Sequence, residues 1–224
     1  MLAATLPSDL TGQVADLGGG AGVVGMAAAY RCAKCHVDLF EIDAQLVDVS
    51  RQSLLLAHNQ QFAGRVSSHC VDINQSAEPL ACVKRKPGSY SAILCNPPFN
   101  DASHQASPDN NRALAHMASA AVPEVWVKTA AQMAGHRALL ALIVRPANLM
   151  DYVSAIQNSF GNVLLKPLHA RVGDPATRLL IGSRKGSRAT LTLLPPLILH
   201  QRDGTFTAEA EDILRGRDTI DLFA

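Results

Sequence analysis

Long apolar runs are absent from this sequence. No stretch approaches the roughly 18 consecutive apolar residues that a membrane-spanning helix requires, and residues 1–12 lack the basic segment and apolar segment of a secretory leader. We therefore expect a cytoplasmic protein with no membrane partner. With 48% hydrophobic residues among 224, the chain still holds enough apolar side chains for one sizeable core, which excludes a disordered chain and a disulfide-stapled miniprotein.

A surplus of charge of one sign is also missing, because 20 Lys and Arg residues balance 19 Asp and Glu residues. The net charge of +1 excludes a highly cationic nucleic-acid coat but leaves room for a local basic face. Two short clusters, Lys84-Arg85-Lys86 and residues 184–188, are candidates for such a face. Charge runs of this kind are more often solvated loops.

Cysteine is sparse and odd in number, with Cys32, Cys35, Cys70, Cys82 and Cys95. Most lie in apolar runs, where a thiol behaves as a small hydrophobe in a reducing compartment, so we expect them to be reduced. Residues 32–36 match the C-x-x-C-H pattern of haem attachment and half of a zinc site, but no second pair with ligand spacing follows. We therefore expect no metal.

The order of the predicted elements indicates an α/β protein. Strand-length apolar runs alternate with helical patterns as far as residue 160, which implies a parallel sheet with helices on both faces. From Val163 onward strands follow one another with turns between them, which indicates an antiparallel sheet edge. The predicted strands are 13–17, 37–42, 66–71, 90–95, 138–144, 163–167, 177–183 and 190–194, and the predicted helices are 23–33, 45–62, 112–134, 148–160 and 207–215. We expect one domain over residues 1–224, with the sole tryptophan, Trp126, in its core.

A glycine-rich loop follows the first predicted strand, in the segment from Asp16 to Gly22, and a helix begins directly after it. Gly18, Gly20 and Gly22 allow the backbone to turn tightly and to approach a ligand at the carboxyl end of the strand. Residues 20–25 also satisfy the G-x-G-x-x-G pattern of dinucleotide binding, which is weak evidence alone. Two cofactors, a nicotinamide dinucleotide and S-adenosylmethionine, therefore compete for this loop.

Acidic residues end the first three predicted strands. Asp16 would repel a pyrophosphate and suits a cofactor with a cationic amino-acid tail, which S-adenosylmethionine has. Glu41 can accept hydrogen bonds from both ribose hydroxyls of either cofactor, and Asp72 can accept one from an adenine amino group. Each of them alone could be a helix cap or a turn former, but three at successive strand ends make chance a weaker explanation.

The fourth predicted strand ends in Asn96-Pro97-Pro98-Phe99. Two prolines remove backbone donors and stiffen the turn, which leaves its carbonyls and the Asn96 side chain free to accept hydrogen bonds. An aromatic amine is a poor nucleophile because its lone pair is delocalised, so a catalyst gains by accepting both amino hydrogens as the nitrogen becomes tetrahedral. The side-chain oxygen of Asn96 and the Pro97 carbonyl can do this. Phe99 can stack on the base, typically worth about 1 to 3 kcal/mol.

These motifs, in this order, resemble those of class I S-adenosylmethionine-dependent methyltransferases that modify planar amino groups. Within that class the chain is similar, over most of its length, to the bacterial tRNA(Val) adenine-37 N6-methyltransferase family. The segments that extend the similarity beyond the site are 112–116, 184–188 and 194–210. The resemblance implies a doubly wound, Rossmann-like, mostly parallel seven-stranded sheet with an antiparallel edge hairpin, and S-adenosylmethionine as the cofactor.

The resemblance further implies methyl transfer to N6 of adenine in RNA, with tRNA as the expected substrate. Its catalytic turn would be Asn96, Pro97, Pro98 and Phe99, and its cofactor residues would be Asp16, Gly18, Gly20, Gly22, Glu41 and Asp72. Related Asn-Pro-Pro-aromatic enzymes act on rRNA guanine, DNA adenine or protein glutamine. A methyltransferase for protein glutamine, rRNA guanine or a small molecule is therefore an alternative, as is a non-catalytic cofactor-binding or RNA-binding module.

Two further expectations concern the surroundings of the site. Arg112, Lys185, Arg188 and the cluster at residues 84–86 would bind the RNA backbone, with affinity that falls steeply with salt. Members of the family carry some tens of residues before the first strand, where this chain has only residues 1–12. The resemblance gives that segment a part in closing the cofactor pocket. Two explanations stay open here: the given sequence starts late, or the protein has a shortened segment and binds the cofactor more weakly.

Overall fold

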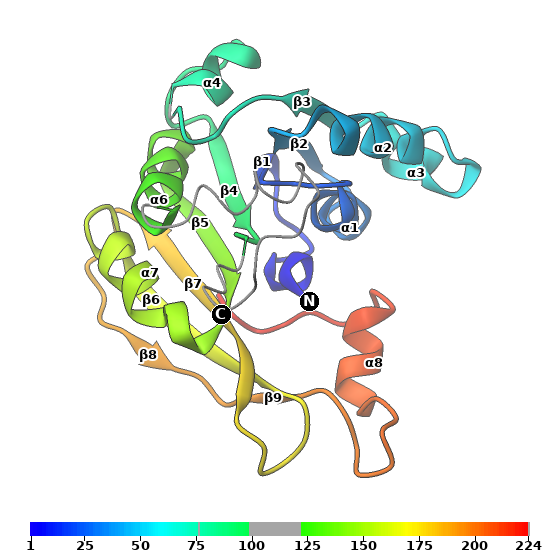
Figure 1. Ribbon diagram of the computed structural model, residues 1–224, viewed down its shortest axis with the longest axis vertical. Coiled ribbons are helices and arrows are strands. Elements are labelled where there is room, and N and C mark those ends of the chain that lie inside the picture. Colours follow the sequence, from blue (N-terminus) through cyan, green and yellow to red (C-terminus); the bar gives the residue numbers. More distant parts are fainter. Residues whose placement is uncertain (76, 99–121, 224) are drawn as a thin grey trace, which may run out of the picture.

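A computed structural model describes residues 1–75, 77–98 and 122–223 of the chain (Figure 1). The strands are β1 (Gly12–Leu17), β2 (Cys35–Glu41), β3 (Val66–Cys70), β4 (Tyr90–Cys95), β5 (Ala134–Val144), β6 (Phe160–His169), β7 (Ala176–Lys185), β8 (Thr192–Leu193) and β9 (Leu197–Ile198). The helices are α1 (Val23–Arg31), α2 (Ala44–Leu54), α3 (Gln60–Ala63), α4 (Glu78–Cys82), α6 (Val122–Met133), α7 (Leu149–Gln157) and α8 (Ala208–Leu214). Three 3₁₀ turns are η1 (Leu2–Thr5), η2 (Ala57–Asn59) and η3 (Pro146–Asn148).

One mixed sheet joins all of these strands, in the order β3-β2-β1-β4-β5-β7-β6. Strands β1 to β5 are parallel, and β7 lies antiparallel between β5 and β6, which confirms the predicted α/β fold with an antiparallel segment. The described sheet has nine strands rather than the expected seven, because β8 and β9 both pair with β6. Pro195 and Pro196 separate these two short strands, since proline cannot donate to a ladder.

Residues of the central strands alternate between two hydrophobic cores, as the period of a strand requires. On one face Val14 and Leu94 join a core with η1, α1, α8 and the carboxyl-terminal residues. On the other face Ala15 and Ile93 join a core with α6 and α7 (Figure 1). The two faces are therefore both covered, which explains the near-continuous apolar runs of the parallel strands.

The helix predictions differ from the structure mainly between residues 45 and 62. One long helix is expected there, but α2 ends at Leu54 and is followed by η2 and α3. The side-chain amide of Asn59 donates to the Ser53 carbonyl (2.8 Å), and this bond satisfies a carbonyl at the end of α2. The short helix near the carboxyl terminus is confirmed together with its cap, because Thr207 Oγ1 accepts from the Ala210 amide (3.2 Å). Among the described helices, none has the length and apolarity to span a bilayer.

Candidate cofactor and catalytic site

The site lies where the chain order of the strands reverses. From β1 the chain builds β2 and β3 on one side, and then crosses to β4 on the other. Leu17 at the end of β1 pairs with Phe40 in β2 and with Cys95 in β4, so the following loops start at the same edge of the sheet. In open α/β sheets a crevice opens at this switch point, and ligands bind there. The structure thus brings together the predicted glycine loop, Glu41 and Asn96.

The glycine loop has the backbone that its sequence predicts. Gly18, Gly20 and Gly22 have φ angles of +67°, +54° and +89°, which glycine adopts without the steric cost that a side chain brings. A Cβ on Gly18 would lie 2.5 Å from Cη2 of Trp126, whereas a Cβ on Gly20 would meet nothing within 4 Å. The indole of Trp126 therefore packs against the loop at Gly18, and the loop is open at Gly20.

Glu41 ties the glycine loop to the end of β2. Its Oε2 accepts from the Gly20 amide (2.8 Å), and its Oε1 accepts from the amides of Ile42 (2.8 Å) and Asp43 (3.0 Å). A carboxylate offers about four acceptor positions. Glu41 can therefore accept one more hydrogen bond without releasing the loop.

A cavity of about 250 Å³ lies at this edge of the sheet. Its lining residues come from the ends of four adjacent strands and from α2 and α6: Gly18, Phe40, Glu41, Ile42, Leu46, Asp72, Ile73, Asn74, Asn96, Pro98 and Trp126. Ile42 and Leu46 are 57% and 38% exposed, so part of the wall is apolar surface that a flat ligand would cover. Asp72 Oδ1 accepts from the backbone and side-chain amides of Asn74 (2.9 and 2.8 Å). No described residue donates to the other oxygen of Asp72.

Sequence reasoning missed the apolar part of this wall and placed Trp126 in the core alone. Trp126 is 6% exposed and does belong to the core, yet it also lines the cavity. Ile42 follows Glu41 directly, so an apolar residue just past an acidic strand end is a signal that could have identified it. No local pattern links Trp126 to Gly18, because α6 meets the loop only in the folded chain.

The predicted catalytic turn follows β4 at the same cavity. Asn96 and Pro98 are exposed and line the cavity, whereas Pro97 is buried between them. The exposed Asn96 amide can therefore meet a ligand. Phe99 and Arg112 lie outside the described residues.

Comparison with known proteins decides the family. The model of the methyltransferase small domain family matches residues 1–164, which is more than half of the chain. The chain belongs to this family. Its sheet order and its antiparallel β7 are those of a Rossmann-like class I S-adenosylmethionine-dependent methyltransferase.

Three relatives illustrate how far the similarity extends. The methyltransferase domain is 36% identical over 96 residues to ribosomal RNA large subunit methyltransferase G of Serratia proteamaculans, covering 42% of this chain and 23% of that protein. It is 22% identical over 207 residues to tRNA1(Val) (adenine(37)-N6)-methyltransferase of Shewanella baltica, covering 90% and 82%. The crystal structure of a predicted O-methyltransferase, protein Atu636 from Agrobacterium tumefaciens, has a TM-score of 0.83 at 30% identity, covering 98% and 96%. The chain thus spans only about a quarter of the ribosomal RNA methyltransferases it matches.

The residues of the cavity fit S-adenosylmethionine, the cofactor of this class of methyltransferase. Ile42 and Leu46 offer apolar surface for an adenine, Glu41 retains an acceptor position for a ribose hydroxyl, and Asp72 has an oxygen without a described donor. The open side of Gly20 leaves room for close approach of a ligand to the backbone. When bound, this cofactor supplies an electrophilic methyl group on a sulfonium.

Asp16 lies beneath the loop of the methyltransferase rather than in its cavity wall. The side chain is 1% exposed, and Oδ2 accepts from the amide of Gly25 (2.7 Å) in the first turn of α1. The N-cap of that helix, Gly22, has no side chain, so Asp16 performs the capping from β1. Burial raises the pKa of Asp16 to about 7, the Gly25 amide opposes this rise, and the nearby charge of Glu41 adds to it. Its predicted contact with the cofactor's amino group stays a prediction.

Replacing Asp16 by Asn separates these two roles. Between the ordinary carboxyl pKa and about 7, the folded protein holds a proton on Asp16 that the unfolded chain has lost, so wild-type stability falls as pH rises through this window. Asn keeps the acceptor for Gly25 and does not titrate. We expect the stability of Asp16→Asn relative to wild type to increase from pH 4 to 8 in denaturant unfolding, and parallel curves would contradict the raised pKa. A cofactor affinity at least tenfold lower would show that the charge also holds the ligand.

The two basic clusters lie at the opposite edge of the sheet from the cavity. Residues 84–86 precede β4, and the guanidinium of the half-buried Arg85 donates to Asp38 Oδ2 (3.2 Å) and Gln13 Oε1 (2.8 Å). Because β7 is antiparallel to β5, Lys185 at its end lies beside the start of β5, and Arg188 follows it. These residues do not line the cavity, and their expected contact with RNA stays a prediction.

Proposed function

We propose that this domain, over residues 1–224, transfers a methyl group from S-adenosylmethionine to the exocyclic N6 amino group of adenine in cytoplasmic RNA, with tRNA as the substrate. The observation that carries this proposal is the exposed Asn96 at the tip of β4, on the wall of the cofactor cavity. Its side-chain oxygen and the Pro97 carbonyl can accept both hydrogens of a planar amine as the nitrogen becomes tetrahedral. The match along 90% of the chain to a tRNA adenine-N6 enzyme supports the choice of substrate.

The same turn argues against an oxygen acceptor. A hydroxyl must lose its proton to a base before or during attack. Asn96 cannot act as a base, and the free acceptor positions of the two carboxylates of the cavity wall, Glu41 and Asp72, are the ones that would hold the cofactor. An amine needs no such base at this position, because its proton can leave after the methyl group has been transferred.

The target base must leave its stack to reach the turn. An amine bonded to Asn96 lies at the wall of the cofactor cavity, which the amino group of a base paired inside a duplex cannot reach. Single-stranded loops of RNA offer bases that can be splayed out at little cost. An unpaired adenine in a tRNA loop meets this requirement.

Nucleoside analysis tests the proposal directly. The purified chain and S-adenosylmethionine are incubated with one substrate at a time: unmodified tRNA transcripts, rRNA fragments or a glutamine peptide. The products are digested and measured by mass spectrometry. We expect N6-methyladenosine from tRNA. Methylguanosine from rRNA, methylglutamine, or no product despite cofactor binding by calorimetry would each contradict it and favour one of the other substrates or a non-catalytic module.

A further inference from the structure

The side of Asn96 that faces β5 is where the target base has to approach. The cofactor cavity lies on the other side, because its lining comes from the ends of β1, β2, β3 and β4 and from α2 and α6. Methyl transfer needs the attacking nitrogen in line with the bond that breaks, opposite the sulfur. Strand β4 is paired with β1 on one side and with β5 on the other, where Leu142 is the partner of Cys95. The base therefore approaches Asn96 over the end of β5.

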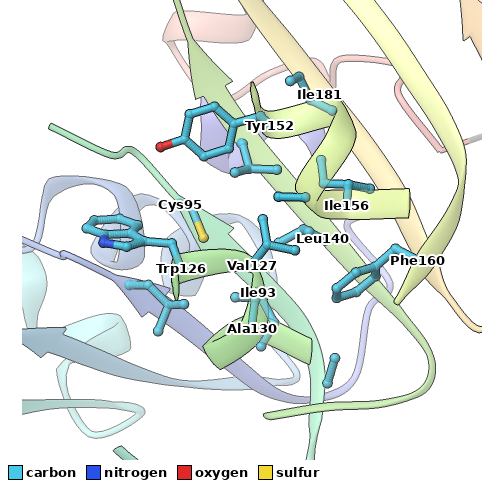
Figure 2. Close-up of a cluster of buried hydrophobic side chains, with 14 of the residues drawn as sticks. Ile93, Cys95, Trp126, Val127, Ala130, Leu140, Tyr152, Ile156, Phe160 and Ile181 are labelled. Atoms are coloured by element: carbon cyan, nitrogen blue, oxygen red, sulfur yellow. The ribbon is translucent and has the colours of Figure 1, made fainter. Parts of the chain in front are cut away.

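Tyr152 occupies this position. It lies in the first turn of α7, which follows the end of β5 after η3. Figure 2 shows its ring projecting from α7, with the oxygen turned away from Ile181 and toward the side on which Cys95 and Trp126 lie. The three residues belong to one buried cluster, and Tyr152 is 4% exposed.

No described residue makes a hydrogen bond to the hydroxyl of Tyr152, and this oxygen is not one of the fully buried side-chain atoms that lack a partner, so it can meet a ligand although the residue as a whole is 4% exposed. The hydroxyl of Tyr90, another buried tyrosine, does have a partner, because it donates to Asp38 Oδ2 (2.9 Å). Burial, followed by the neighbouring Cys95 and Asp151, raises the pKa of Tyr152, so the hydroxyl keeps its proton and remains a donor at neutral pH.

We propose that the Tyr152 hydroxyl is a substrate contact, which donates a hydrogen bond to a ring-nitrogen acceptor of the base whose amino group lies at Asn96. This inference rests on the proposed function and extends it to base selection. Adenine has an acceptor nitrogen beside its exocyclic amine on the Watson–Crick edge, which an enzyme can read once the base is unstacked. The unpaired hydroxyl then gains its partner only when the base is bound.

Tyr152→Phe tests the contact, because it removes the hydroxyl and keeps the ring in its packing. We expect kcat/KM for RNA to fall about tenfold, mainly through kcat, with cofactor affinity unchanged. The melting temperature should stay the same or rise, since the wild-type hydroxyl has no bond to lose. Unchanged turnover would overturn the inference, and so would a melting temperature lowered by several degrees, which would mean that the hydroxyl is bonded within the fold.

Tyr90→Phe is the matched control. Its hydroxyl is bonded to Asp38, and neither residue lines the cavity, so its loss should lower the melting temperature by a few degrees and leave kcat/KM of the folded protein unchanged. The wild-type assay separates this inference from the proposed function. A wild-type chain that forms no N6-methyladenosine refutes the proposed function, whereas an active wild type with an equally active Tyr152→Phe variant refutes only the role of Tyr152.

Discussion

Asn96→Ala is expected to lower kcat at least a hundredfold while leaving the Kd for S-adenosylmethionine within about twofold of wild type. The physical reason is that the amide oxygen acts on charge that develops only in the transition state, and deleting one such group typically costs about 10²- to 10³-fold in kcat. Asn96 is exposed, so its removal should leave the folded state intact. Single-turnover methylation and calorimetry of the same preparation would measure the two quantities.

Asn74→Ala is the matched control for this prediction. Asn74 is also an exposed asparagine of the cavity wall, but it stands at the end of β3 and donates to Asp72 Oδ1. Its loss should change the cofactor Kd by a few-fold and leave kcat at saturating cofactor unchanged. An Asn96→Ala variant with full turnover, or one that fails only in cofactor binding as Asn74→Ala is expected to do, would contradict the catalytic role assigned to the turn.

The edge of the sheet that carries the site was predictable from the sequence, because parallel strands all end at one edge. Once residues 13–17, 37–42 and 90–95 are recognised as parallel strands, the glycine loop, Glu41 and Asn96 must be neighbours. The φ angles of Gly18, Gly20 and Gly22 follow from the same local signals. These features depend on chain order and on turn chemistry, both of which a single sequence contains.

The remaining parts of the site depend on packing between elements that are distant in sequence. The packing of α1, α6 and α7 on the sheet decides three features of the site. These are the burial of Asp16 under α1, the contact of Trp126 with Gly18 and the position of Tyr152. The basic cluster at the end of β7 lies at the opposite edge of the sheet from the cavity because that strand is antiparallel to β5, and its contact with RNA stays a prediction. The periodicity of hydrophobic residues along a segment indicates that a helix covers a sheet. It does not indicate which side chain of the helix contacts which loop residue.

Gly18→Ala is expected to abolish cofactor binding and to destabilise the fold, whereas Gly20→Ala should have a much smaller effect. Both residues have positive φ, so alanine costs about 1 to 2 kcal/mol of backbone strain at either position. Only at Gly18 does the added Cβ also lie 2.5 Å from the Trp126 ring, and overpacking of this kind typically adds about 1 to 3 kcal/mol. Denaturant unfolding and calorimetry with S-adenosylmethionine would measure both losses.

The pairing of Gly18 with Trp126 makes the two parts of this loss separable. Phe has no second ring to occupy the space that a Cβ on Gly18 needs, so the double variant Gly18→Ala, Trp126→Phe should recover part of the stability lost in Gly18→Ala. The backbone strain common to Gly18 and Gly20 should remain in the double variant. The double variant should therefore be no more stable than Gly20→Ala. Strictly additive losses in the double-mutant cycle would show that Trp126 does not restrict the loop at Gly18. A positive coupling energy would instead mean that the packing of Trp126 in α6 also sets the shape of the cofactor loop at Gly18.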